Sequence, residues 1–169
     1  INEIIVMTSP EDKILIQPLL TDVFNHTINT PQEENIYKLK YQNAWEIKSI
    51  KKHANIIVAS LDFPKDSTVD LLMQRILSKH NKEAELLVLG DLYAKNQLFS
   101  LIHSHDAIAF EKIIKNNKEW LLDQYNTLFE KRILNDIYRN GKNKDLSDKI
   151  LKIIGYTIEL QTDFELIKQ

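Results

Sequence analysis

The chain has 169 residues, enough for one domain with a sizeable core and too few for two full domains. Its 43% hydrophobic and 27% charged residues are typical of a folded globular domain and exclude intrinsic disorder. With 22 basic and 24 acidic residues the net charge is −2, so no overall positive field attracts nucleic acid. The lack of cysteine excludes disulfides, thiolate nucleophiles and zinc–thiolate sites.

Hydrophobic periodicity and turn residues predict an alternation of strands and helices over the first 104 residues. In chain order we expect a strand at 3–8, a helix at 10–24, a strand at 35–41, a short helix or turn at 43–52, a strand at 53–62, a helix at 66–80, and strands at 85–91 and 97–104. Pro18 lacks an amide hydrogen, so we expect a break in the first helix near Gln17. Either Asp66 or Ser67 is expected to cap the helix at 66–80.

The longest periodic stretch lies at 106–140, where apolar residues recur every three or four positions and predict a long helix. Asn116 and Asn117 are poor helix formers, so this stretch is expected to be either two helices or one helix that bends there. A shorter helix is predicted at 144–154. Alternation then predicts a final strand at 156–161.

These elements predict an α+β fold, with an antiparallel or mixed sheet and the helices packed on one face. The order strand, helix, strand, strand, helix, strand is that of a ferredoxin-like unit, which is therefore the expected architecture of residues 1–104. The long helix 106–140 follows that unit. We predict a single domain over residues 1–169 that belongs to a longer protein.

Cofactor-binding and catalytic motifs are nearly absent from the sequence. Glycine occurs only at positions 90, 141 and 155, so neither a dinucleotide-binding fingerprint nor a phosphate-binding loop can be formed. The nucleophile elbow of hydrolases and the paired-histidine motif of zinc proteases are also missing. We therefore expect no cofactor.

His103 and His105 are the one close pair of histidines, with Asp106 adjacent. If the strand at 97–104 continues past Ser104, both imidazoles lie on one face and could bind a metal ion. This arrangement would suit a small hydrolase or a metal-dependent enzyme. The alternative is a polar strand end that precedes a helix capped by Asp106.

Trp45 lies beside a polar loop and is expected to be partly exposed, as tryptophans at binding surfaces are. Basic residues follow nearby at Lys48, Lys51, Lys52 and His53, and they could contact phosphate. Three lysines without arginine are, however, more typical of a solvated face. We therefore expect Trp45 to mark a surface for a protein or small ligand, and no nucleic-acid binding.

Four short segments resemble the N-terminal part of a domain of unknown function that occurs in predicted lipoproteins of Bacteroidota. These segments are Asn2-Glu-Ile-Ile-Val6, Pro31 to Leu39, Asn55-Ile-Ile-Val58 and Asp91-Leu-Tyr-Ala-Lys-Asn-Gln97. Ala54 stands where that family usually has arginine. The resemblance implies an envelope lipoprotein whose lipidated cysteine lies upstream and has been removed. It supplies no catalytic residue, and Gln97 is its one polar position of interest.

We therefore predict a non-catalytic binding or interaction domain of a lipid-anchored cell-envelope protein, with Trp45 and Gln97 as candidate binding residues. Membrane contact would come only through the removed N-terminal anchor. The alternatives are a small hydrolase or metal-dependent enzyme that uses His103, His105 and Asp106, and a cytoplasmic location. The large helical face of the chain also leaves a homodimer open.

Overall fold

A computed structural model describes residues 2–28, 34–65, 67–165 and 167. The chain packs into two compact units, Ile1–Asn126 and Thr127–Gln169. Compactness of this kind does not measure independent folding, so the single domain over residues 1–169 stays a prediction. Part of the family-like segment from Pro31 to Leu39, and Asp66 as a helix cap, lie outside the described residues.

The first unit is built on a five-stranded mixed sheet in the order β4-β1-β5-β7-β6. Its strands are β1 (Asn2–Met7), β4 (Tyr37–Gln42), β5 (Asn55–Ser60), β6 (Leu86–Gly90) and β7 (Leu98–His103). The first four strands in that order are parallel, and only β6 runs antiparallel, alongside β7. A separate antiparallel pair is formed by β2 (Thr27–Ile28) and β3 (Glu34–Asn35).

Helices connect these strands and follow the last of them, where the sequence predicts helices. They are α1 (Pro10–Phe24), the 3-10 helix η1 (Ala44–Glu46), α2 (Ile47–Ile50), α3 (Thr68–Leu77) and α4 (Ala107–Ile137). Ser9 caps α1 by accepting a hydrogen bond from the Asp12 amide, and Ser67 caps α3 in the same way. The Asp106 carboxylate accepts from the Ala109 amide and caps α4.

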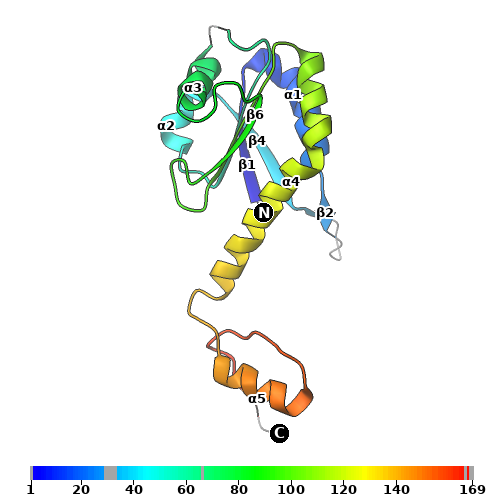
Figure 1. Cartoon of the computed structure of the whole chain (residues 1–169), viewed down its shortest axis with the longest axis vertical. Coiled ribbons are helices and arrows are strands. Elements are labelled where there is room, and N and C mark those ends of the chain that lie inside the picture. Colours follow the sequence, from blue (N-terminus) through cyan, green and yellow to red (C-terminus); the bar gives the residue numbers. More distant parts are fainter. Residues whose placement is uncertain (1, 29–33, 66, 166, 168–169) are drawn as a thin grey trace. The chain divides into compact units, whose positions relative to one another are not determined.

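Helices cover both faces of the sheet, as Figure 1 shows, with α2 and α3 on one side and α1 and α4 on the other. Side chains of α3 pack with Ile5, Ile56 and Phe99 on the first face. On the second face, the Phe24 ring of α1 lies 5.0 Å from the Tyr125 ring of α4. The expectation of helices on one face is therefore wrong.

The α+β class and the mixed sheet are confirmed, but the strands of residues 1–104 do not pair as in a ferredoxin-like unit. Parallel neighbours require crossover connections, which are almost always right-handed. The crossover from β1 to β4 runs one way across the sheet, and the connection from β5 to β7 runs the other way. Two crossovers of the same hand that run in opposite directions place their helices on opposite faces of the sheet.

Two local predictions differ from the structure, and of the two alternatives for residues 106–140 the structure has the single helix. Helix α1 continues through Pro18, which is exposed, so solvent can reach the carbonyl oxygen that Pro18 leaves without an amide donor. One helix, α4, spans Asn116 and Asn117. Residues 156–160 form no strand, and a single antiparallel bridge joins Gln161 to Lys142.

The second unit comprises the end of α4, helix α5 (Lys144–Ile154) and the described part of the C-terminal segment. The Asn143 side chain caps α5 at its start, and Gly155 ends it with a left-handed φ of 76°. Lys142 pairs with Glu159 at 2.6 Å and ties the C-terminal segment to the start of α5. Among the described residues, no helix is long and apolar enough to cross a lipid bilayer.

Candidate functional site

The four parallel strands end at one edge of the sheet, and this carboxyl edge gathers the segments that follow β1, β4, β5 and β7. In open α/β sheets, ligands bind outside this edge where the strand order reverses. Here the reversal lies between β1 and β5, because β1 connects toward β4 and β5 connects toward β7. The carboxyl edge is therefore the first place to look for a site.

An internal ion pair occupies the reversal point itself. The Lys65 ammonium lies 2.7 and 2.9 Å from the two carboxylate oxygens of Asp12, whose Oδ2 also accepts from the Leu61 amide at 3.1 Å. Asp12 is only 5% exposed, although it lies in the first turn of α1. The Lys65 side chain and the Leu61 backbone amide thus satisfy this carboxylate and join α1 to the loop after β5.

A second buried carboxylate holds the other end of the same loop. Asp70, in the first turn of α3, accepts from the Ser60 hydroxyl and from the Lys65 backbone amide, each at 2.5 Å. Lys65 therefore joins α1 through its side chain and α3 through its backbone. We interpret Asp12, Lys65 and Asp70 as structural groups that position both helices at the carboxyl edge.

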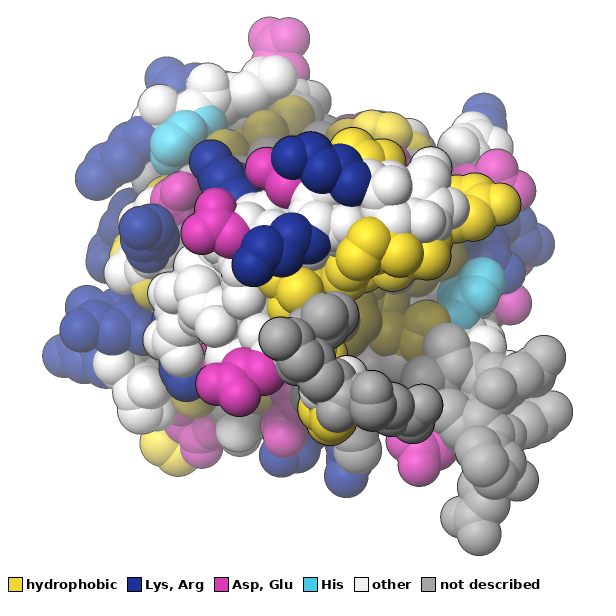
Figure 2. Space-filling model, turned by 90° about the horizontal axis from the view of Figure 1, so that it is seen from below, with side chains coloured by type: hydrophobic (Ala, Val, Ile, Leu, Met, Phe, Trp, Pro, Cys, Tyr) yellow, Lys and Arg dark blue, Asp and Glu magenta, His cyan; other side chains and the backbone are white. Residues whose placement is uncertain are grey.

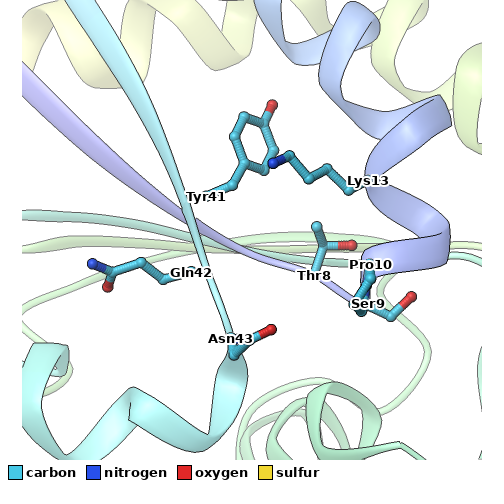
Figure 3. Close-up of a pocket in the computed structure, with 7 residues that line it drawn as sticks. All are labelled: Thr8, Ser9, Pro10, Lys13, Tyr41, Gln42 and Asn43. Carbon is cyan, nitrogen blue, oxygen red and sulfur yellow. The ribbon is translucent and has the colours of Figure 1, made fainter.

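The groups Asp12, Lys65 and Asp70 are called the clamp below. A cavity of about 220 Å³ lies next to the clamp, at the ends of β1 and β4 and beside the start of α1. Its lining residues are Thr8, Ser9, Pro10, Lys13, Tyr41, Gln42 and Asn43 (Figure 3). Parallel pairing of Met7 with Gln42 brings the two strand ends together, although they are far apart in the sequence. The lining is dominated by hydroxyl and amide groups.

The geometry of the cavity is set by β4 on one side and α1 on the other (Figure 3). Thr8 and Asn43 lie at the ends of the two strands, and Lys13 reaches across from α1. The Lys13 ammonium lies 5.0 Å from the centre of the Tyr41 ring, a cation–π contact. The Gln42 side chain points to the other side of β4.

Two hydroxyl groups at this cavity are buried without a hydrogen-bond partner among the described residues, Thr8 Oγ1 and Tyr41 Oη. Thr8 as a whole is 5% exposed. A buried hydroxyl that makes no hydrogen bond costs about 1–3 kcal/mol, so native structures rarely retain one. Burial also raises the pKa of the Tyr41 phenol from 10.0 to about 12, so the phenol stays neutral and able to donate well above physiological pH.

The start of α1 adds little attraction for an anion. The Ser9 hydroxyl already accepts from the Asp12 amide. The pKa of Glu11 lies below its ordinary value because its own backbone amide and the Ser9 hydroxyl bond its carboxylate. The helix terminus therefore carries its own negative charge, and the cavity is better suited to a neutral polar molecule than to a phosphate.

The two predicted binding residues lie at opposite edges of the sheet. Trp45 is 68% exposed in η1, two residues beyond Asn43 and so close to the cavity along the chain. Gln97 precedes β7 at the amino edge and is buried, and its amide nitrogen donates to the carbonyl oxygens of Lys51 and His53 at 2.7 Å. Gln97 thereby fastens two loops together, and a ligand has no access to its amide.

The histidine pair does not share a strand face, because β7 ends at His103. The His103 ring packs on Phe63 with centroids 4.2 Å apart, and burial lowers its pKa. His105 has a side chain 74% exposed and lies 3.3 Å from Asp106. Within the described part of the chain, no three His, Cys, Asp or Glu side chains are grouped to hold a metal ion.

Sequence reasoning did not single out Thr8, Tyr41 or Asn43 as site residues. The available signal was that each lies at the end of a strand or directly after it. That signal becomes a site only when β1 and β4 are known to be parallel neighbours, which the sequence did not reveal.

Comparisons with protein-family models, with curated proteins and with solved structures each find no match for this chain. No residue function can therefore be transferred from a relative.

We predict that Lys65→Met lowers the free energy of unfolding by about 2–4 kcal/mol, because the buried Asp12 carboxylate loses its cation. Chemical denaturation at neutral pH measures this change. The matched control is Lys118→Met, which breaks an exposed pair with Asp22 and should change stability by less than about 1 kcal/mol. Equal losses for both variants would contradict the structural interpretation of the clamp.

We also predict a pH-dependent difference between the wild type and Tyr41→Phe. The pKa of Tyr41 rises on folding from an ordinary value of 10.0 to about 12, so its ionisation opposes folding. The wild type should therefore lose stability relative to Tyr41→Phe as the pH rises from 10.0 to about 12. Urea titrations at several pH values measure this difference, and a constant difference would show that the Tyr41 hydroxyl is not buried.

Proposed function

We propose that this chain is a non-catalytic binding domain that takes a small, neutral, hydroxyl-bearing ligand in the cavity between β1, β4 and α1. The observation that carries the proposal is the pair of buried, unpartnered hydroxyls of Thr8 and Tyr41 at that cavity. A ligand that supplies the missing hydrogen bonds recovers the free energy that their burial costs.

The size and lining of the cavity favour a ligand comparable to a single sugar ring. About 220 Å³ is below the range typical of drug-sized ligands, so the occupant must be small. Hydroxyl groups act as donor and acceptor at once, and the Asn43 amide offers both functions as well. Lys13 covers the Tyr41 ring, so an aromatic ligand finds little stacking surface there.

Trp45 extends this proposal beyond the cavity. It is the exposed aromatic residue that follows β4, where the cavity also ends. Tryptophan offers a large, rigid surface for sugars and proteins at little cost in conformational entropy. We assign Trp45 as a second contact. It would touch either a ligand that is larger than the cavity or a larger molecule that carries the bound ligand group.

The binding experiment uses a panel of monosaccharides at millimolar concentration and amide chemical shifts of the whole chain. We predict that a binding sugar shifts the signals of Thr8, Tyr41 and Asn43. Thr8→Val should weaken that binding at least tenfold, because a methyl group cannot replace the hydrogen bond. The same variant should unfold at equal or higher denaturant concentration than the wild type, because it no longer buries an unpartnered hydroxyl.

The matched control is Thr127→Val, at an exposed position of α4, which should leave sugar binding unchanged. Two results would contradict the proposal: no monosaccharide shifts the cavity signals, or Thr8→Val binds as well as the wild type. A Thr8→Val variant that is clearly destabilised would also show that its hydroxyl serves the fold.

The resemblance to envelope lipoproteins supports a location for this binding domain, a lipid-anchored protein of the cell envelope. We predict that the native protein sediments with membranes and has an intact mass above 19.8 kDa that includes a lipid. Fractionation of native cells followed by mass spectrometry measures both. A native species in the cytoplasmic fraction without a lipid would contradict the location and leave the cavity proposal standing.

A further inference from the structure

A second cavity, of about 260 Å³, lies between α1 and β4. Its lining residues are Gln17, Thr21, Phe24, Asn25, Asn35, Tyr37, Lys38, Leu39 and Tyr41. Tyr41 also lines the first cavity, the one at the ends of β1 and β4, so its side chain stands at the boundary of the two. The two cavities are therefore neighbours along β4, which is an edge strand of the sheet.

Two rows of side chains line this surface and give it a direction. On α1, Lys13, Gln17 and Thr21 recur every four residues and so lie one above another along one side of the helix. On β4, every second residue from Tyr37 to Tyr41 faces the same side of the sheet. At a rise of 1.5 Å per residue, the row on α1 is roughly 12 Å long. The two cavities thus follow one another in a line.

The second cavity offers neutral hydrogen-bonding groups. The side chains of Gln17, Thr21, Asn25 and Asn35 are exposed, and none bonds a residue that the structure describes. Amide and hydroxyl groups both donate and accept hydrogen bonds. These side chains are therefore free to exchange water for the hydroxyl groups of a ligand.

Charge contributes little to the second cavity. Among its described lining residues Lys38 is the one charged group, and it alternates with Leu39, so its side chain leaves β4 toward the other face. On that face lies Glu3, which is the register partner of Lys38 and pairs with Lys40 at 2.5 Å. Figure 2 shows lysine, arginine and acidic side chains interspersed over the face seen from below, without a broad field of one sign there. A neutral ligand suits these surroundings.

We propose that the two cavities together bind one neutral oligosaccharide of two or more linked sugar rings. The inference rests on the proposed function, because the first cavity must hold one of the rings. The two volumes, about 220 and 260 Å³, are similar, as a ligand made of similar units requires. One ring bonds Thr8 and Tyr41, and the next ring bonds Gln17 and Thr21.

Lys13 lies where the two rings would be joined. Its side chain reaches from α1 to Tyr41 (Figure 3), and the ammonium lies 5.0 Å from the ring centre. Lys13 is exposed, and a cation–π contact at an exposed position contributes little stability. A bound oligosaccharide therefore displaces this side chain at low cost, and the ammonium then donates hydrogen bonds to hydroxyl groups of the ligand.

An extended peptide that adds a strand to β4 fits this surface less well. The strand carries Lys38 and Lys40 at the open edge of the sheet. Lysines on an edge strand are a common means by which proteins prevent the addition of another strand. Such a peptide would bond mainly the backbone of β4, whereas the free side chains of Gln17 and Thr21 belong to α1.

The binding experiment compares disaccharides with their component monosaccharides. Maltose, cellobiose, lactose and chitobiose are titrated into the whole chain while amide chemical shifts are recorded. A monosaccharide that binds shifts the signals of Thr8 and Tyr41. A disaccharide that contains it also shifts those of Gln17 and Thr21, and it binds about tenfold more tightly because it forms additional hydrogen bonds.

Substitutions in the second cavity separate it from the first. The double variant Gln17→Ala with Thr21→Ala should stay folded, because alanine is the best helix former and both positions are exposed. It should weaken disaccharide binding about tenfold and leave monosaccharide binding unchanged. The matched control is Gln74→Ala, at an exposed position of α3 on the other face of the sheet, which should change neither affinity.

The outcomes distinguish this inference from the proposed function. If a monosaccharide binds the first cavity but no disaccharide binds more tightly or shifts Gln17 and Thr21, the second cavity is not part of the site and the proposed function stands. If no sugar shifts either cavity, both proposals fail. Binding of a polar peptide that shifts Leu39 and Lys40, without binding of any sugar, would overturn both and assign the edge of β4 to an added strand.

Discussion

The parallel pairing of β1 with both β4 and β5 is the constraint on which the first unit depends. Parallel neighbours cannot be joined by a tight turn, so a crossover must return the chain to the same end of the sheet. The crossovers from β1 and from β5 leave in opposite directions, which places helices on both faces. The same pairing brings four strand ends to one edge, where both the clamp and the cavity lie.

The clamp and the cavity use buried polar groups in opposite ways. Around Lys65, both buried carboxylates are fully engaged by the chain, so these groups stabilise the fold and leave nothing for a ligand. Around Thr8 and Tyr41, buried hydroxyls have no partner in the described chain. Because native interiors rarely leave such groups unbonded, the proposed binding site rests on the second set.

The two units differ in how many of their hydrophobic side chains are buried. In the first unit, apolar side chains from both faces of the sheet are buried beneath helices, and rings such as Phe24 and Tyr125 interlock edge to face. In the second unit, Leu146 is buried and Ile153 is exposed on the same short helix. The first unit thus encloses most of its large apolar side chains, whereas the second unit leaves most of its own exposed.

The sequence by itself determined most of the helices and strands and the α+β class, because strand and helix periodicities and caps such as Ser9 act within a few residues. It also determined the exposure of Trp45, which follows from the polar residues around it. Only the tertiary structure decided that β1 and β4 are parallel, that Gln97 is enclosed, and that His103 and His105 are apart. Which strands pair depends on contacts between residues far apart in the chain, and local periodicity does not predict those contacts.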